Sequence, residues 1–414
     1  MTAGSLTTAD AGATTATTTS SSSTTTGSAS DALEALRQYL AIARAERPEF
    51  ASQDFANTPL SAADAKTAGE LIWGDHAELI AEERQAEAEA KAITIGEHTL
   101  RYDFTAFGDE PETGHSLYIS LHGGGEADAS VNDEQWDNQK VLYEPAEGIY
   151  LAPRAPTNTW NLWHEPHIDV LLQRLIENFI VIEGVDPNHV YVMGYSAGGD
   201  GVYQLGPRMA DSWAAAAMMA GHPNDAKPDS LRNLGFTIHV GALDTAFDRN
   251  LVAAEWGALL DDLEAMDPGG YPHYVEVHPD KPHWMDLEDA VAVPWMAEFT
   301  RNPTPARVVW LQDDVTHSRF YWLSVDAANA VGGARIEATV TGQTIDIESS
   351  GVKRLTLRLS DALLDLDQPI RVASGNTSLY EGTLERTMLT LWTTLLERGD
   401  PALVFSSEVA VDLE

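Results

Sequence analysis

The stretch that decides the fold is His189-Val-Tyr-Val-Met-Gly-Tyr-Ser196-Ala-Gly-Gly-Asp200. Its first half is an apolar, β-branched run of the kind that forms a buried strand. Glycines two residues before and two after Ser196 leave room for a sharp, strained turn, and a helix is expected to begin near Gly199. Ser196 would then stand clear of the sheet as a nucleophile. The same turn aims the amide of Ala197 at the point where an oxyanion would form.

Around this stretch, short apolar runs alternate with helical segments over residues 93–302. The runs predict strands at His115–Leu121, Gly148–Ala152, His189–Met193, Ala214–Met219, Phe236–Val240 and Tyr274–Val277. Apolar spacing predicts helices at about 166–184, 199–212, 246–265 and 286–299. This alternation is typical of the α/β class, in which helices cover both faces of a mostly parallel sheet.

A second motif, Leu121-His122-Gly123-Gly124-Gly125, follows the first of these strands. Consecutive glycines allow bare backbone amides to approach a substrate oxygen closely. We therefore expect Gly123 and Gly124 to donate to the oxyanion together with Ala197. The alternative is a flexible connector without a chemical role.

A serine hydroxyl needs a base, and histidine can both take its proton and return it to a leaving group. His283 lies in the loop after the last apolar run and before the final predicted helix, so it is the expected base. His278 is the rival, but it ends a strand. Either histidine could instead be an ordinary loop residue.

The base in turn needs a carboxylate that orients its ring and stabilises the imidazolium. Asp244, in Gly241-Ala-Leu-Asp244, directly follows a predicted strand and is preferred over Asp248. Capping of the next helix is the alternative role for each. The chain order serine, aspartate, histidine excludes the other common orders of such triads.

These motifs together resemble the α/β-hydrolase superfamily, nearest its polyhydroxybutyrate-depolymerase-like and feruloyl-esterase-like branch. The matching segments are Tyr191–Gly201, His122–Gly125, Gly241–Asp244 and Pro282–Trp284. The resemblance covers about 93–302 and implies ester hydrolysis through an acyl-enzyme, with no cofactor. It does not explain the rest of the chain, and the cysteines of many secreted members are missing here.

Aromatic and polar residues near these motifs are candidates for contacting a substrate. We expect this role for His122, Tyr195, Trp160, Trp163 and Trp284. For the two tryptophans of the Trp160–Trp163 segment, packing within their own loop is an equal alternative. His164, His167 and Asp169 lack the helical i, i+4 histidine spacing of a zinc protease, so no metal is expected there.

The regions flanking the catalytic segment have different compositions. Residues 1–30 are rich in Thr and Ser and are expected to be a disordered tail. Residues 31–92 have helical spacing and form a helical extension. Beyond Asn302-Pro-Thr-Pro, residues 303–414 alternate like strands and are expected to form a small β-rich domain, most simply a sandwich.

The composition limits the partners of the protein. A net charge of −39 over 414 residues disfavours nucleic acid and anionic membranes, and is typical of salt-adapted as well as of ordinary acidic proteins. The chain has no cysteine, which excludes disulfides but leaves the compartment open. Neither a signal peptide nor a membrane-spanning stretch is visible, which favours the cytoplasm.

The expected substrate is a small-molecule or polymer-derived ester. Two other functions stay open at this point. One is a serine peptidase of the prolyl-oligopeptidase type, although residues 30–92 are too few and too helical for a propeller. The other is a binding protein that uses the C-terminal region, with the α/β core as its scaffold.

Overall fold

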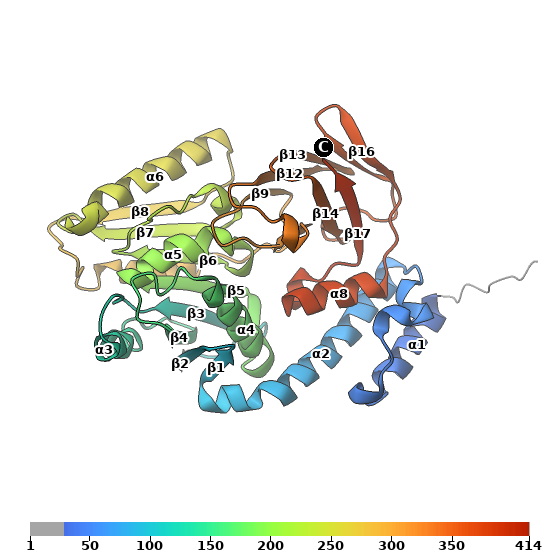
Figure 1. Cartoon of the computed structure of the whole chain (residues 1–414), viewed down its shortest axis with the longest axis horizontal. Coiled ribbons are helices and arrows are strands. Elements are labelled where there is room, and N and C mark those ends of the chain that lie inside the picture. The colour runs from blue at the N-terminus through green and yellow to red at the C-terminus, as the bar shows by residue number, and fades with distance from the viewer. Residues whose placement is uncertain (1–28, 414) are drawn as a thin grey trace, which may run out of the picture.

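The computed structural model describes residues 29–413 (Figure 1). The expected tail over 1–30 lies outside the described residues, except that Ala29 and Ser30 begin the first helix, α1 (Ala29–Leu40). None of the described helices is both long and apolar enough to cross a membrane.

An eight-stranded sheet forms the centre of the molecule, with the order β1-β2-β4-β3-β5-β6-β7-β8. The pairs β1–β2 and β2–β4 are antiparallel and the other pairs are parallel. Its strands are β1 (Ala92–Ile95), β2 (His98–Phe107), β3 (His115–Leu121), β4 (Gly148–Arg154), β5 (Val185–Tyr195), β6 (Ala215–Met219), β7 (Gly235–Gly241) and β8 (His273–His278). This mostly parallel sheet confirms the predicted α/β-hydrolase fold class.

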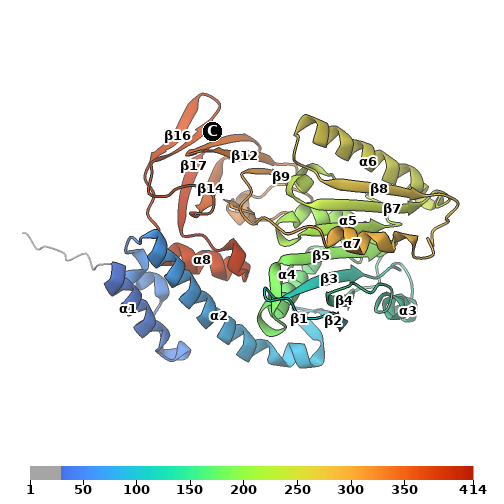
Figure 2. The same cartoon turned by 180° about the vertical axis from the view of Figure 1, so that it is seen from behind.

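Helices cover both faces of this sheet. On one face lie α4 (Pro166–Ile182), α5 (Ala197–Arg208) and α6 (Arg249–Met266), whose buried side chains join one core cluster with those of the sheet (Figure 1). The short α7 (Ala292–Met296) packs on the other face, where it joins a second cluster (Figure 2). The remaining helix of this region, α3 (Ala129–Gln139), follows the glycine motif.

The prediction of one helix over 286–299 was wrong. The segment instead holds a 3₁₀ turn at Glu288–Val291 followed by the five-residue α7. Asp286 and Leu287 both have positive φ angles, so a right-handed helix cannot begin there. This tight path keeps the chain that follows the His283 loop close to the sheet.

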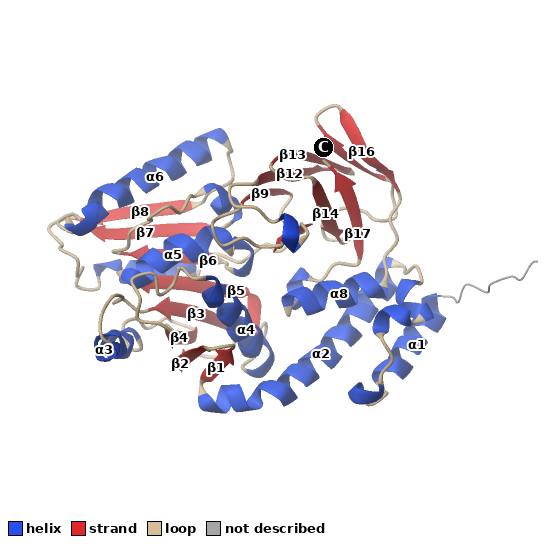
Figure 3. Ribbon diagram, viewed as in Figure 1, coloured by secondary structure: helices blue, strands red, loops and turns tan. Residues whose placement is uncertain are grey.

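A long N-terminal helix connects the C-terminal region to the central sheet. The 29-residue α2 (Ala62–Ala90) runs from beside α8 (Met388–Arg398) to the start of β1 (Figure 3). Ala65, Ala68 and Ile72 of α2 share a core cluster with Leu391 and Leu395 of α8. At its other end, Glu87 of α2 pairs with Arg174 of α4 at 2.7 Å.

The C-terminal region contains two sheets whose buried side chains belong to the same cluster. One sheet has the order β10-β11-β14-β17, and the other β16-β15-β13-β12-β9. The main strands are β9 (Arg307–Leu311), β12 (Arg335–Thr341), β13 (Thr344–Ser350), β14 (Arg354–Leu359), β15 (Ile370–Ser374), β16 (Thr377–Gly382) and β17 (Ser407–Asp412); β10 (Arg319–Phe320) and β11 (Leu323–Ser324) are short. The region is therefore β-rich as predicted, but the sequence reading missed α8.

Candidate active site

Ser196 sits on a strained turn between β5 and α5. Its backbone has φ 58° and ψ −122°, a conformation that few non-glycine residues adopt. The two flanking glycines make this turn possible: a Cβ on Gly194 would lie 2.3 Å from the carbonyl oxygen of Gly198, and a Cβ on Gly198 would lie 2.0 Å from that of Leu121. Only glycine fits at both positions, so the Gly-x-Ser-x-Gly pattern here has a steric cause.

Three side chains from three separate loops form a continuous hydrogen-bonded chain. His283 Nε2 lies 3.0 Å from Ser196 Oγ, and His283 Nδ1 lies 2.6 Å from Asp244 Oδ2. Because an ionised carboxylate only accepts, Nδ1–H donates to Asp244, and Nε2 is left to accept the serine proton. Asp244 is almost fully buried, whereas 42% of the His283 side chain is exposed. The imidazole of His283 is therefore accessible from solvent and the carboxylate of Asp244 is not.

The backbone around Asp244 fixes the position of its carboxylate. Its amide donates to Gly241 O at 3.0 Å, and its carbonyl accepts from Asn250 N at 3.1 Å. Arg249 Nη1 lies 3.7 Å from Asp244 Oδ1, on the side away from the His283 bond. The rival Asp248 is exposed, with a positive φ, at the start of α6.

The rival histidine, His278, is buried and is hydrogen-bonded to a different residue. Its Nε2 lies 3.2 Å from Nδ1 of His239, another buried histidine. The structure therefore brings His283, and not His278, to Ser196.

The glycine motif lies directly against the nucleophile. A Cβ on Gly123 would be 3.1 Å from Ser196 Cβ, so the bare backbone passes beside the hydroxyl. Over the described part of the chain, the amides of Gly123, Gly124 and Ala197 donate no hydrogen bond to the protein. Gly125 differs, since its amide donates to Asn132 Oδ1 at 2.8 Å. Three unpaired amides thus remain near Ser196 for an anionic oxygen.

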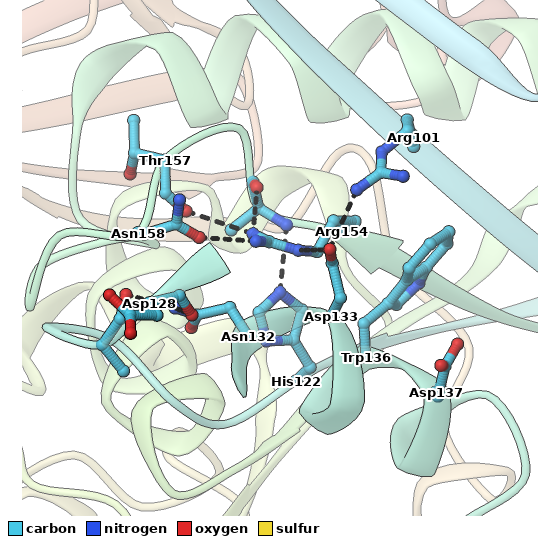
Figure 4. Close-up of polar contacts among 12 residues, drawn as sticks. Arg101, His122, Asp128, Asn132, Asp133, Trp136, Asp137, Arg154, Thr157 and Asn158 are labelled. Carbon is cyan, nitrogen blue, oxygen red and sulfur yellow. Dashed lines mark hydrogen bonds and ion pairs between the residues drawn. The ribbon is translucent and has the colours of Figure 1, made fainter. Parts of the chain in front are cut away.

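His122 holds the glycine motif and does not contact a substrate, which corrects our expectation. The ring is fully buried; its Nδ1 donates to Gly123 O at 2.6 Å and its Nε2 accepts from Ala155 N at 3.1 Å (Figure 4). Burial lowers the pKa of His122 to about 4, so the ring is neutral and can do both. Both ring nitrogens are therefore used by the backbone.

Arg154, beside this histidine at the end of β4, extends the same support. Its guanidinium donates to Asp133 Oδ1 at 2.8 Å, to Asn158 Oδ1 at 2.5 Å and to the carbonyl of Ala155 at 2.6 Å (Figure 4). Asp133 belongs to α3, as does Asn132, which binds Gly125. The helix after the glycine motif is thus tied to the strand beside it.

Two of the predicted aromatic contacts are also supporting residues. Trp163 is fully buried and its indole N–H donates to His122 O at 2.9 Å. Tyr195 is 7% exposed; its hydroxyl donates to His283 O at 2.7 Å and accepts from Met285 N at 3.0 Å. The polar groups of both side chains form hydrogen bonds to the backbone of the loops that carry His122 and His283. These two residues therefore hold those loops in position.

The other two aromatic residues stay accessible. Trp160 is 57% exposed, with its ring edge-on to His164. Trp284 is 45% exposed and packs against the Tyr195 ring at 5.6 Å. Trp284, next to His283 in sequence, is the better placed to touch a bound ligand.

The position of Asp200 in the first turn of α5 predicts a carboxylate that satisfies free amides of that helix, but the sequence did not predict its partner in a distant loop. This residue of α5 is mostly buried and accepts a hydrogen bond from His222 N at 2.6 Å. Burial raises its pKa to about 6, partly offset by that bond and by Arg249. Asn132 was missed as well, since an asparagine in an acidic helix carries no sequence signal for holding a glycine amide.

Asp169 is paired with an arginine and a histidine from other segments of the chain. Its carboxylate accepts from Arg208 Nη2 at 2.6 Å and contacts His317 Nε2 at 2.8 Å. His167 instead stacks on the ring of His98 with centroids 3.7 Å apart. These residues join α4 to α5 and to the loop after β9.

Comparisons with known proteins give structural matches only. No family model and no curated protein matches the chain. Among solved structures, it is similar to a thermostable esterase, with TM-score 0.39 and 20% identity over 51% of this chain and 62% of that one, which is less than two thirds of its length. It is also similar to the Bacillus cereus carboxylesterase, with TM-score 0.35 and 16% identity over 52% of this chain and 99% of that one. A mutant of the feruloyl esterase module from Clostridium thermocellum, complexed with sinapinate, matches with TM-score 0.34 and 15% identity over 49% and 83%.

Proposed function

We propose that this chain is a serine hydrolase that cleaves carboxylic esters through an acyl-enzyme. The observation that carries the proposal is the chain Asp244–His283–Ser196, with distances of 2.6 and 3.0 Å, beside unpaired amides. A serine in a strained turn, next to a half-exposed imidazole that a buried carboxylate orients, has the arrangement that nucleophilic acyl transfer requires.

In the first half of the reaction, Ser196 Oγ attacks the ester carbonyl while His283 Nε2 takes its proton. The negative oxygen of the tetrahedral intermediate is stabilised by the amides of Ala197, Gly123 and Gly124. Asp244 stabilises the imidazolium through Nδ1–H. His283 then gives the proton to the leaving alcohol, and the acyl group stays on Ser196.

In the second half, water replaces the alcohol. His283 takes a proton from the water as it attacks the acyl carbonyl, and the same amides hold the second oxyanion. Collapse of this intermediate returns the proton to Ser196 Oγ and releases the acid. No step needs a metal or a cofactor.

An esterase and a peptidase of this kind use the same triad and differ in the leaving group, which is an alcohol in one and an amine in the other. The described residues before the α/β core, 29–91, form α1, α2 and short 3₁₀ turns and contain no propeller like the one that gates prolyl-oligopeptidase-type enzymes. The half-exposed His283 and the accessible Trp284 favour a small ester with an acyl or aryl group that can pack on the indole.

The test is a matched panel of p-nitrophenyl esters and p-nitroanilides that carry the same acyl groups, from acetyl to octanoyl, plus methyl esters of hydroxycinnamic acids. We expect turnover of the esters and little turnover of the anilides, and no turnover by Ser196→Ala. Faster release from the anilides would overturn the esterase proposal in favour of the peptidase. Equal rates for the wild type and Ser196→Ala would overturn both and favour a binding protein.

A further inference from the structure

A histidine and carboxylate cluster lies at the edge of the central sheet, outside the proposed triad. His239 of β7 pairs in register with Glu276 of β8, and His278 follows Glu276 by two residues. Register partners and residues two apart share one face of a sheet, so the three side chains project together. One possible ligand atom from each lies within 4.8 Å of the other two.

The spacing of the two imidazoles suits one metal ion. His239 Nδ1 and His278 Nε2 are 3.2 Å apart. Two nitrogens at this separation, each ~2.0–2.1 Å from a zinc ion, subtend an angle of about 100° at the metal, which is close to tetrahedral. The ring nitrogens therefore need little movement to share an ion.

A second, independent feature is the surroundings of the second ring nitrogen of each histidine, the one that would not bind the ion. The other nitrogen of His239, Nε2, lies 2.9 Å from Thr237 Oγ1. The other nitrogen of His278, Nδ1, lies 3.6 Å from Glu288 Oε2 and 3.9 Å from Glu276 Oε1, so it faces two carboxylates without a hydrogen bond to either. Ligating histidines characteristically donate their second N–H to an oxygen, as His239 Nε2 is placed to do toward Thr237, which leaves the first nitrogen free for the metal.

The carboxylate of the cluster has an outer partner too. The hydroxyl of Tyr274 donates to Glu276 Oε2 at 2.5 Å, so one oxygen is held and Oε1 remains. Both histidines are buried, whereas 37% of the Glu276 side chain is exposed, and β8 is the last strand of the sheet. Glu276 is therefore the member of the cluster that reaches the protein surface.

We propose that this cluster binds one divalent transition-metal ion of the zinc class through His239 Nδ1, His278 Nε2 and the carboxylate of Glu276, with water as the fourth ligand. Two imidazoles and one carboxylate are donors that suit zinc and neighbouring transition metals, and not calcium or magnesium.

The position of the site gives the ion a structural role. The carbonyl of His278 accepts from Ala242 N at 2.9 Å, and Asp244 follows two residues later. His283 follows His278 by five residues. An ion shared by β7 and β8 would fasten together the two strand ends from which the triad acid and base emerge, and thereby stabilise the folded state.

The experiment uses the full chain after treatment with a chelator and its removal. Co²⁺ is added and its visible ligand-field absorption recorded, Zn²⁺ is titrated by calorimetry, and thermal unfolding is followed with and without Zn²⁺. We expect one equivalent to bind, intense cobalt bands typical of four-coordination, and a melting temperature raised by a few degrees with excess Zn²⁺.

Three variants give the result its meaning. Glu276→Gln and His278→Gln are expected to weaken binding at least tenfold and to lose the zinc-dependent rise in melting temperature. His273→Gln is the matched control, because His273 lies on the same strand but bonds to Tyr271 O and Asp261. It should bind the ion like the wild type.

Two results would overturn the proposal. One is the absence of stoichiometric binding by the wild type, in which case the imidazoles simply hydrogen-bond to each other. The other is wild-type affinity in Glu276→Gln, a partly exposed position where glutamine can still accept from Tyr274, so that folding is preserved even if His278→Gln unfolds. None of these readouts uses ester turnover, so a failure here leaves the esterase proposal standing.

Discussion

The hydroxyl of Tyr195 lies 2.7 Å from the backbone carbonyl of His283 and donates a hydrogen bond to it. Tyr195 directly precedes the candidate nucleophile, so one side chain links the serine turn to the loop that carries His283. The same hydroxyl accepts from Met285 N, which fixes the loop on both sides of Trp284. The distance from His283 to Ser196 therefore depends on a residue that has no role in the chemistry.

Removal of this link should affect the rate more than substrate binding. We expect Tyr195→Phe to lower kcat about tenfold with little change in KM, because a small displacement of the base costs rate. Tyr191→Phe is the control, since Tyr191 lies on the same strand and donates to Phe299 O. Steady-state kinetics with a p-nitrophenyl ester give both constants. Equal kcat values for the two variants would show that the link does not position the base.

The choice between the two aspartates can be tested by removing each charge. Asp244→Asn should lower kcat by roughly 10³–10⁴ because the imidazole loses its oriented tautomer and the charge that stabilises it. Asp248→Asn should stay within about twofold of the wild type, since this side chain is exposed and the substitution changes little else. A large loss in Asp248→Asn, or none in Asp244→Asn, would reverse the assignment.

The glycine motif should tolerate no side chain. Gly124 has φ 109°, and a Cβ there would lie 2.4 Å from Asn132 Oδ1. Gly124→Ala should therefore displace the loop and lower kcat by about 10²–10³, as expected when an oxyanion donor is lost. Gly96→Ala is the control for backbone strain, because Gly96 also has positive φ but open space around it. If both variants kept wild-type kcat, these amides would not hold the oxyanion.

Asp200 should make stability depend on pH. Its pKa of about 6 in the folded protein exceeds the usual value of 3.8, so the folded state holds a proton that the unfolded state has released between pH 4 and 6. The contribution of Asp200 to stability therefore falls as pH rises through this range, by roughly 2–3 kcal/mol.

Replacement by asparagine removes this dependence. Asp200→Asn should gain stability relative to the wild type between pH 4 and pH 7, by that same amount, in urea unfolding at each pH. A constant difference between the two proteins over this range would mean that the carboxylate is not held protonated by burial.

Much of the fold follows from local sequence patterns. The buried strands β3 to β7 are apolar runs long enough to be recognised, and the serine turn has a steric signature in Gly194 and Gly198. The edge strand β1 and its neighbour β2 were missed because their half-exposed residues give weak alternation. The amphipathic helix α8 was missed because it interrupts a series of strands.

The candidate site also contains residues that the sequence predicts and residues that it does not. Ser196, His283 and Asp244 were predicted because each ends or follows a strand in a fixed order, and the structure places them in contact. The residues that hold them are different: Asn132 and Arg154 act through contacts between segments far apart in sequence. His122 and Trp163 were assigned to the substrate because their sequence position places them near Ser196 and the glycine motif but does not say which way their side chains point.

The most direct test of the account is covalent labelling by a fluorophosphonate, followed by peptide mass spectrometry. The account predicts one label per chain, located on Ser196, with slower labelling in His283→Ala and none in Ser196→Ala. Ser230→Ala, which removes a buried serine that bonds to Leu311, should label like the wild type. An unlabelled wild type, or a label that persists in Ser196→Ala, would contradict the claim that this serine is an activated nucleophile.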